Sequence, residues 1–383
     1  MLTYGGVPKT IEVTSHLFAD AFDGKIAFDG SSVFGMTDVS NSDLLLVPDL
    51  SSFRRLPIYD SEFGNVAVVM CYAVAPDGKP AAGCTRSILN KELAKMGKHG
   101  FDKMNVGFEP EFFIISKDSK DVSAHLDTGT YASAEGEDDV TAHVRREIMF
   151  ELERAGIIPL TSHHERAPSA CEITYKYADC MTTCDNLIIG KLITKKVASK
   201  NGMFASFEPK PFEGVNGSGL HTNISLAKGG KNIFASESGI SDCAKHFLAG
   251  VLESARGLCF LTTGNHEDAY KRLVKGFEAP TNICWGYHNR SAMIRIPKAS
   301  REATRIEIRS PDPTMNPYLG CAGILRAGLD GIGRKLLPSP SVDFDAWEDM
   351  RAKGIVSLPS SLSEARREFT ECVLLRDLVR TAV

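Results

Sequence analysis

Two glutamates lie within the apolar run N-V-G-F-E-P-E-F-F-I-I, residues 105–115. In a strand, alternate side chains point to opposite faces, so Glu109 and Glu111 would share one face and the apolar residues the other. Two ionised carboxylates held together away from water repel each other, unless one is protonated or a cation lies between them. The pair therefore predicts a metal site or, as the simpler alternative, the solvated acidic face of a half-exposed strand.

Two further stretches carry polar residues in patterns that suit a binding site. In T-S-H-H-E-R-A-P-S-A-C-E-I, Glu165 and Glu172 flank a proline-containing turn and could converge on one point. In G-V-N-G-S-G-L-H-T-N-I-S-L, the glycines permit close approach of a ligand to the backbone, and a following strand would place His221, Asn223 and Ser225 on one face. A surface loop and an ordinary turn are the alternatives for these two stretches.

The stretch T-R-I-E-I-R-S-P-D-P places Arg305, Glu307 and Arg309 on one strand face, and Arg290 and Arg295 precede it in the chain. This pattern is typical of a salt-bridged surface strand. It also suits an anion site, because guanidinium groups bind phosphate or carboxylate through two parallel hydrogen bonds.

Together, these stretches supply five carboxylates and one imidazole. A set rich in oxygen ligands suits Mg²⁺ or Mn²⁺ better than zinc or an iron–sulfur cluster. The arginines indicate an anionic ligand, most simply a nucleotide polyphosphate together with an acid. The candidate metal ligands are Glu109, Glu111, Glu165, Glu172, His221 and Glu307.

The composition excludes several classes of protein. A net charge of −4 over 383 residues argues against nucleic-acid binding, because no basic excess is available to neutralise phosphates. The ten cysteines are scattered without a C-x-x-C pair, and the N-terminus lacks the features of a signal peptide. No apolar stretch reaches membrane-spanning length. We therefore expect a cytoplasmic protein that binds no membrane.

The order of expected elements predicts an α+β protein. A small β-rich domain would occupy residues 1–80, ending in the turn-rich segment 75–83, and a larger domain would occupy 81–383. Periodicity predicts helices at 87–96, 140–155 and 181–202. It predicts strands at 10–14, 43–47, 66–72, 204–208, 220–226, 292–297 and 304–309, besides the strand that carries the paired glutamates.

Eight ordered motifs resemble the type I glutamine synthetases. They are F-D-G-S-S, F-E-P-E-F-F, S-H-H-E-R-A-P, P-K-P-F-E-G-V-N-G-S-G-L-H, Y-K-R-L-V-K-G-F-E-A-P, N-R-S-A-M-I-R-I-P, R-I-E-I-R and D-P-T-M-N-P-Y-L. The resemblance runs from about residue 8 nearly to the end. It implies a β-grasp N-terminal domain, a catalytic domain with a curved antiparallel sheet and helices, and active sites shared between neighbouring subunits of a homo-oligomeric ring.

The resemblance also implies a role for each matching residue. Two or three Mg²⁺ or Mn²⁺ ions would lie in each site, one of them held by Glu111, Glu165 and Glu172 and another by Glu109, His221 and Glu307. Glutamate would be bound by Asn216, Gly217, Arg272 and Arg309. ATP, as a substrate, would be bound by Tyr177, Ser225, Arg290, Arg295 and Arg305. Ammonium would be bound by Asp29 and Ser32 of the adjacent subunit with Tyr131, Glu165 and Glu278. The catalytic residues would be Asp29 as base, Glu278 on a flap, and Arg290.

The implied activity is that of an ATP-dependent glutamate–ammonia ligase acting through γ-glutamyl phosphate. Two alternatives stay open: a ligase that joins a larger amine to glutamate, and a non-catalytic relative. The altered turn Ser169-Ala170-Cys171, where the family has Gly-Gln-His or Gly-Gln-Asn, motivates the first. So does the altered flap start G-N-H-E-D-A-Y-K-R, while Leu160, which stands where some members have an acidic ribose contact, is a difference that would alter the binding of the nucleotide.

The ends of the sequence motivate the second alternative. The family's opening helix and first β-grasp strand have no counterpart before Met1, and the sequence stops at Val383, before a helical segment that docks two rings. We therefore do not expect a double ring, and a single ring stays open. The short stretch 336–360 matches members without an adenylylation loop, so we expect no control by adenylylation.

Overall fold

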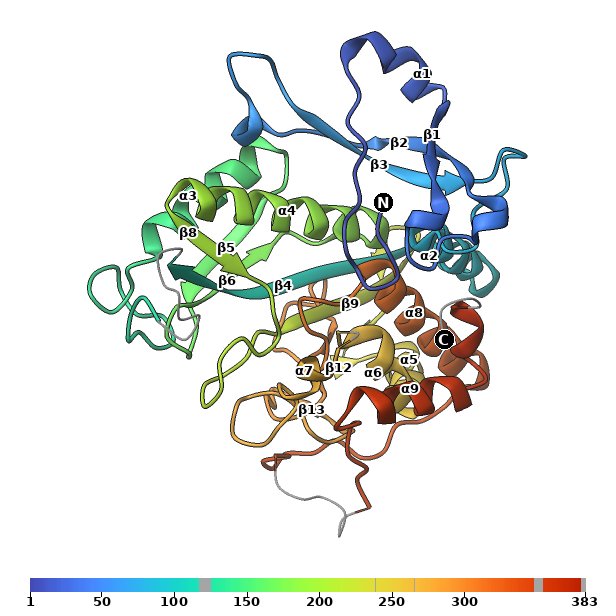
Figure 1. Ribbon diagram of the computed structural model, residues 1–383. Coiled ribbons are helices and arrows are strands. Elements are labelled where there is room, and N and C mark those ends of the chain that lie inside the picture. Colours follow the sequence, from blue (N-terminus) through green and yellow to red (C-terminus); the bar gives the residue numbers. More distant parts are fainter. Residues whose placement is uncertain (117–124, 238, 265, 348–353, 380–383) are drawn as a thin grey trace.

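The computed structural model describes residues 1–116, 125–237, 239–264, 266–347 and 354–379. A small antiparallel sheet formed by β1 (Ile26–Asp29), β2 (Asp43–Arg55) and β3 (Ala67–Val74) occupies the top of Figure 1. The strand predicted at 10–14 is wrong, since these residues adopt no regular structure and Ile11 is exposed. The alternating residues of this segment have no neighbouring strand to pair with and no core to cover, so they do not form a strand.

The large sheet is organised around β4 (Lys103–Ser116). Its first half, through Pro110, pairs with β9 (Leu220–Lys228), whereas its second half pairs with β6 (Ala170–Tyr175) and β8 (Met203–Ser206). The change of partner falls between Glu109 and Glu111, so the two glutamates lie where two groups of strands meet.

The remaining strands extend this sheet on both sides, in the order β13-β14-β15-β9-β4-β6-β5. The pairs are antiparallel except for β13 and β14. The additional strands are β5 (Pro159–His164), β7 (Ala178–Asp179), β10 (Lys231–Asn232), β13 (Trp285–Tyr287), β14 (Ile294–Ile296) and β15 (Ile306–Ile308), while β11 (Ala235–Ser236) and β12 (Gly239–Ile240) form a separate hairpin.

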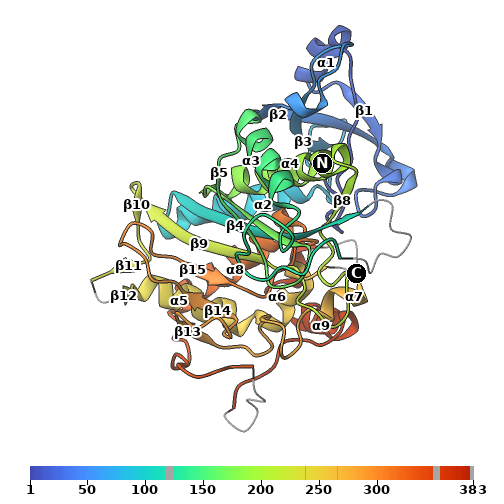
Figure 2. The ribbon, with the colours of Figure 1, turned by 90° about the vertical axis from the view of Figure 1, so that its left-hand side faces the viewer.

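Helices cover the large sheet and connect it to the small one. The helices α3 (Ala142–Arg154) and α4 (Cys180–Lys200) lie between the small sheet and β4, and a second group gathers below β4 and β9 in both views (Figures 1 and 2). This second group contains α5 (Asp242–Glu253), α6 (Ala255–Thr262), α8 (Pro317–Arg334) and α9 (Leu362–Glu371). The other helices are α1 (Phe18–Phe22), α2 (Thr85–Leu93) and α7 (Glu267–Tyr270). The predicted α+β organisation is confirmed.

The predicted helices and most predicted strands are present, with ends shifted by a few residues. The helix 181–202 corresponds to α4, whose N-cap Asp179 accepts a hydrogen bond from the Thr182 N–H. The strand 292–297 corresponds to the shorter β14, and 304–309 to β15. In the described ranges, no helix is long and apolar enough to span a bilayer.

A buried ion network joins the small sheet to the helices. Arg86 on α2 lies 2.7 Å from Asp49 on β2 and 2.8 Å from Asp185 on α4, and Tyr318 on α8 donates a 2.6 Å hydrogen bond to Asp185. Arg86 also lies over the ring of Tyr72. Arg86 thus joins α2 to β2, β3 and α4 directly, and to α8 through Asp185. Only 3% of its side chain is exposed, so water screens these interactions little.

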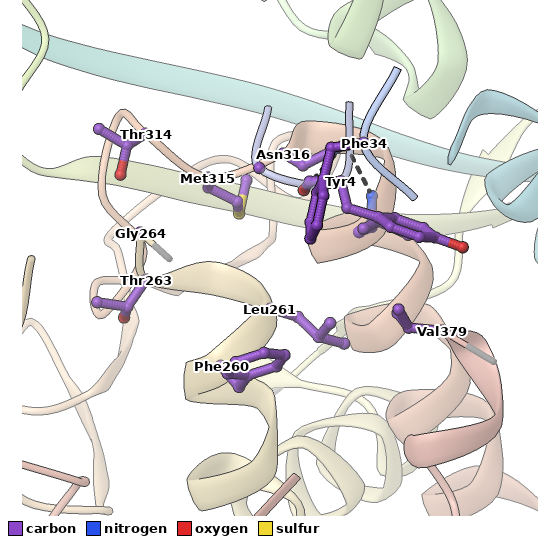
Figure 3. A pocket seen from close by; sticks show the side chains of 12 residues that line it. Tyr4, Phe34, Phe260, Leu261, Thr263, Gly264, Thr314, Met315, Asn316 and Val379 are labelled. Atoms are coloured by element: carbon purple, nitrogen blue, oxygen red, sulfur yellow. Dashed lines mark hydrogen bonds between the residues drawn. The ribbon is translucent and has the colours of Figure 1, made fainter. Parts of the chain in front are cut away.

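The N-terminal segment packs on the helices around α8. Asn316 caps α8 by accepting hydrogen bonds from the Tyr318 and Leu319 N–H groups, and its amide donates to the Thr3 carbonyl at 2.9 Å. Figure 3 shows the pocket next to this contact, where Tyr4 and Phe34 face the end of α6. None of its lining residues carries a predicted role, so this pocket is separate from the predicted site.

We expect Arg86→Ala to destabilise the protein by about 3–5 kcal/mol, because it leaves Asp185 buried without its cation. Chemical denaturation followed by tryptophan fluorescence measures the change. Arg55→Ala, which removes an exposed ion pair with Asp60, is the matched control and should cost at most about 1 kcal/mol. Equal effects of the two substitutions would contradict the role of the buried network.

Candidate active site

The centre of β4 brings four of the six predicted metal ligands onto one face. In register, Glu109 lies opposite His221 on β9, and Glu111 lies opposite Glu172 on β6. His221 is positioned between the two β4 acids, with Nδ1 3.4 Å from a Glu109 oxygen and Nε2 3.7 Å from a Glu111 oxygen. The face shared by the pair is therefore an interior acidic cluster, and the alternative of a solvated acidic strand face is wrong.

Glu307 completes the cluster from β15. Glu307 is 1% exposed, and its carboxylate lies between two arginines, 2.6 Å from Arg295 and 2.7 Å from Arg309. Ligand atoms of Glu109, His221 and Glu307 all lie within 4.8 Å of one another. The alternation read from R-I-E-I-R is confirmed, because Ile306 and Ile308 pack into the hydrophobic core on the opposite face.

Glu165 enters the cluster from the end of β5, together with a histidine that the sequence reasoning missed. His163 bridges the acids, with Nδ1 3.4 Å from Glu165 and Nε2 3.2 Å from Glu172. Its contact with Glu172 raises the pKa of His163 to about 9. The signal was present in S-H-H-E, because alternation in a strand places His163 and Glu165 on one face.

The charges in the cluster are unevenly balanced. Burial, followed by the nearby Glu111 and Glu172, raises the pKa of Glu165 to about 8, and burial also raises the pKa of Glu172. Burial acts to raise the pKa of Glu109 as well, but hydrogen bonds from His221 and Asn223 bring that pKa down to about 2. The side formed by Glu111, Glu165 and Glu172 thus carries repulsion that a divalent cation would relieve, and the donor set fits Mg²⁺ or Mn²⁺.

Gly219 is a second residue that sequence reasoning did not single out. Its N–H donates a 2.7 Å hydrogen bond to Glu111. A Cβ at this position would lie 2.7 Å from a guanidinium nitrogen of Arg272 and 3.0 Å from Nε2 of His221. Because Gly219 has no side chain, its backbone can approach Glu111, Arg272 and His221 closely. This explains why the run N-G-S-G ends in glycine.

The residues predicted to bind glutamate lie around this glycine. Arg272 is buried, and its guanidinium donates to the carbonyls of Ser310 and Arg309. Gly217 lies close enough to Arg272 that an added Cβ would contact its side chain at 3.3 Å. Asn216 donates a 3.3 Å hydrogen bond to Glu278. The structure thus brings this predicted set together beside the acidic cluster.

The residues predicted to bind ATP extend from the cluster along β9 and β15. Arg305 donates a 2.8 Å hydrogen bond to Asn223, and Ser225 is half-buried further along β9. Tyr177 is exposed and lies against Gly107 of β4, where an added Cβ would be 3.3 Å from the tyrosine Cβ. The side chain of Arg290 is also exposed, while its carbonyl accepts a hydrogen bond from Arg309. Tyr177 and Arg290 are accordingly exposed to a ligand, whereas Arg295 pairs with Glu307 and Arg305 with Asn223.

The residues predicted to bind ammonium are only partly brought together. Tyr131 packs edge-on against the His163 ring, with centroids 5.0 Å apart. Glu278 has a positive φ of 58° and lies 3.0 Å from Arg166, a residue without a predicted role. Asp29, by contrast, is the last residue of β1, and Ser32 lies in the 3-10 turn that follows it. The strand β1 belongs to the small sheet, away from the centre of β4 (Figure 1).

The altered turn Ser169-Ala170-Cys171 has a structural basis of its own. Ser169 adopts a left-handed conformation with φ 62°, which costs a residue with a side chain about 1 kcal/mol or more. Its hydroxyl accepts a 2.6 Å hydrogen bond from the Leu126 N–H, and its own N–H donates to Asp127 at 2.7 Å. These bonds offset the strain, so serine is accommodated at a position of the turn where glycine would be unstrained.

We expect Gly219→Ala to weaken binding of Mn²⁺ by about 10- to 100-fold, because the added methyl displaces His221 and Arg272 from Glu111. The φ of Gly219 lies outside the left-handed region, so alanine introduces no backbone strain. Calorimetric titration with Mn²⁺ measures the affinity. Gly97→Ala, whose added methyl meets nothing within 4 Å, is the control. Unchanged affinity in Gly219→Ala would contradict the role given to the bare backbone.

Two family models match nearly the whole chain. The glutamine synthetase β-grasp domain matches residues 3–76, and the glutamine synthetase catalytic domain matches residues 82–383. A glutamine synthetase of Thermus thermophilus is 41% identical over 389 residues, an alignment covering 97% of this chain and 85% of the relative. A glutamine synthetase of Staphylococcus aureus is 42% identical over 376 residues, covering 96% and 83%.

Solved structures agree with these matches. A complex of GmaS with ADP superposes with a TM-score of 0.88 at 29% identity, covering 99% of this chain and 88% of the other. A glutamine synthetase of Plasmodium falciparum superposes with a TM-score of 0.81 at 25% identity, covering 96% and 87%. The chain therefore belongs to the glutamine synthetase family of ligases, which form C–N bonds with ATP.

Proposed function

We propose that this protein is an ATP-dependent glutamate–ammonia ligase that acts through γ-glutamyl phosphate. The observation that carries the proposal is the convergence of six predicted metal ligands, from β4, β6, β9, β15 and the residue that follows β5, beside buried arginines. Family membership and glutamine synthetase relatives at 41–42% identity support the same reaction.

The acidic cluster is proposed to hold two or three Mg²⁺ or Mn²⁺ ions. Glu111, Glu165 and Glu172 would bind one, and Glu109, His221 and Glu307 another. When bound, such ions supply positive charge that offsets repulsion between a substrate carboxylate and the phosphates of ATP. Arg295 and Arg309 hold Glu307 in place, so its carboxylate is oriented before any ligand arrives.

The arginines around the cluster are proposed to bind the two anionic substrates. Arg272 and Arg309, with Asn216 and Gly217, would bind glutamate on the side of the glycine-rich loop. Arg290, Arg295 and Arg305, with Ser225 and Tyr177, would bind ATP on the β9–β15 side. Fixing both substrates turns attack of the γ-carboxylate on the γ-phosphate into a step between oriented partners.

The amine step is proposed to require a second subunit. Glu278 lies at a turn beside Glu165 and Arg166, where it would shield an acyl phosphate from water. Asp29 would come from the neighbouring subunit and accept a proton from ammonium. Hydrogen bonds from Ser31 and then Ser32 lower the pKa of Asp29, so its carboxylate is ionised at neutral pH and attracts a cation.

The direct test is an assay of the purified 383-residue chain with glutamate, ATP, Mg²⁺ and ammonium. We expect glutamine and phosphate in equal amounts, with both products dependent on glutamate and on ammonium. The same assay with methylamine distinguishes an ammonia ligase from a ligase for a larger amine. An ammonia ligase should have a kcat/KM for ammonia that exceeds the value for methylamine by orders of magnitude. Phosphate release without glutamine, or a preference for the larger amine, would overturn the proposal.

Hybrids of two inactive variants test the shared site. We expect Asp29→Ala and Glu278→Ala to be inactive separately, whereas oligomers that contain both recover up to about a quarter of the activity, because some interfaces pair two intact halves. Co-expression with two affinity tags isolates the hybrids.

The matched control combines Glu278→Ala with Glu165→Ala. Both of these residues belong to the same half of the proposed site, so their hybrids should stay inactive. Activity that fails to return in the hybrids of Asp29→Ala and Glu278→Ala would contradict the proposed position of Asp29.

A further inference from the structure

Arg166 contacts both carboxylates of this chain that the proposed function assigns to the amine. Its guanidinium Nε lies 3.0 Å from Glu278, and its backbone N–H donates to the Glu165 carboxylate at 3.3 Å. The arginine side chain is 60% exposed and Glu278 is 32% exposed, so the ion pair lies at the entrance to the cluster.

A guanidinium at this position bears the same charge as ammonium. An arginine is ionised at every physiological pH, whereas ammonium approaching Glu278 brings a second positive charge to the same carboxylate. Two like charges about 4 Å apart repel by about 1 kcal/mol in water and by more where solvent is partly excluded. Ammonium that binds to Glu278 is therefore repelled by the guanidinium of Arg166, with which it shares the carboxylate.

The turn that carries Glu278 is fixed without Arg166. Asn216 donates a hydrogen bond to the same carboxylate oxygen, and Arg309 donates to the Glu278 carbonyl. The two residues that follow, Ala279 and Pro280, are buried. Removal of the Arg166 side chain would thus change the charge beside Glu278 more than it would change the position of Glu278.

We propose that Arg166 is a specificity-determining residue that weakens the binding of cationic amines by occupying Glu278. The inference rests on the proposed function, in which Glu278 faces the amine. Arg166 sets the KM for ammonium through its side chain, which contacts Glu278, whereas its contact with the proposed metal ligand Glu165 is made by the backbone N–H and is kept in a substituted protein.

The test compares Arg166→Gln and Arg166→Lys with the wild-type protein at saturating Mg²⁺. We expect Arg166→Gln to lower the KM for ammonium about three- to tenfold, which corresponds to the loss of one partly screened like-charge contact. The KM for glutamate, the KM for ATP and kcat should stay within about twofold of wild type. A tenfold change in any of them would need a change of about 1.4 kcal/mol in the corresponding free energy, and we expect no change of that size away from Glu278. Arg166→Lys keeps the charge and should keep the high KM.

Methylammonium separates charge from size. If charge is the cause, Arg166→Gln lowers the KM for methylammonium and for ammonium by the same factor, because both are monovalent cations. If the arginine acted by filling space, methylammonium would gain more than ammonium, and that result would overturn the inference. Arg334→Gln, which removes an exposed arginine paired with Glu253 on the far helices, is the matched control and should change no kinetic constant.

The remaining outcomes also decide the matter. An unchanged KM for ammonium in Arg166→Gln, with an active wild type, overturns the role of Arg166 and leaves the proposed function intact. A lowered KM in both Arg166→Gln and Arg166→Lys likewise overturns it, because the charge would then be irrelevant. A wild type without glutamate- and ammonium-dependent activity overturns the proposed function, and this inference with it.

Discussion

Repulsion among buried carboxylates is the constraint on which the rest of this structure depends. Glu111, Glu165 and Glu172 converge in a place where burial and their neighbours raise the pKa of Glu165 to about 8. A fold tolerates such a cluster only when protons or cations offset the charge. His163 contributes one positive charge, because contact with Glu172 raises its pKa to about 9. The remaining imbalance is what makes the cluster suitable for divalent ions rather than for a permanent internal salt bridge.

The two sides of the cluster are built differently around β4. Glu307 is held by Arg295 and Arg309, which already balance its charge, whereas Glu165 and Glu172 share the single imidazole of His163. The partner switch along β4 makes this possible, since one long strand borders β9 on one side of the glutamates and β6 on the other. One side is therefore oriented by the protein itself, and the other has more to gain from a bound cation.

Sequence reasoning found the parts that depend on local periodicity. Alternation in the β4 run and in R-I-E-I-R placed the acids on one face, and helical spacing located α3 and α4. It missed what depends on register between distant segments, such as Gly219 approaching Arg272 or Arg166 pairing with Glu278. The wrong strand at 10–14 has the same cause, because alternation indicates a strand only when another strand and a core are present to receive it. Neither condition can be read from five residues.

The chain taken alone assembles the acidic cluster more fully than the amine side. The predicted metal ligands and the arginines around them come from one large sheet and its connecting loops, and their positions rest on contacts within the chain. Asp29 instead lies at the end of a strand of the small sheet and Ser32 in the turn that follows, and the Arg86 network holds this sheet to the helices. An acid such as Asp29, outside the cluster of its own subunit, can act only in a site of a neighbouring subunit. In the proposed arrangement, the buried Arg86 pairs would therefore affect catalysis as well as stability, since they determine how each subunit presents Asp29 to its neighbour.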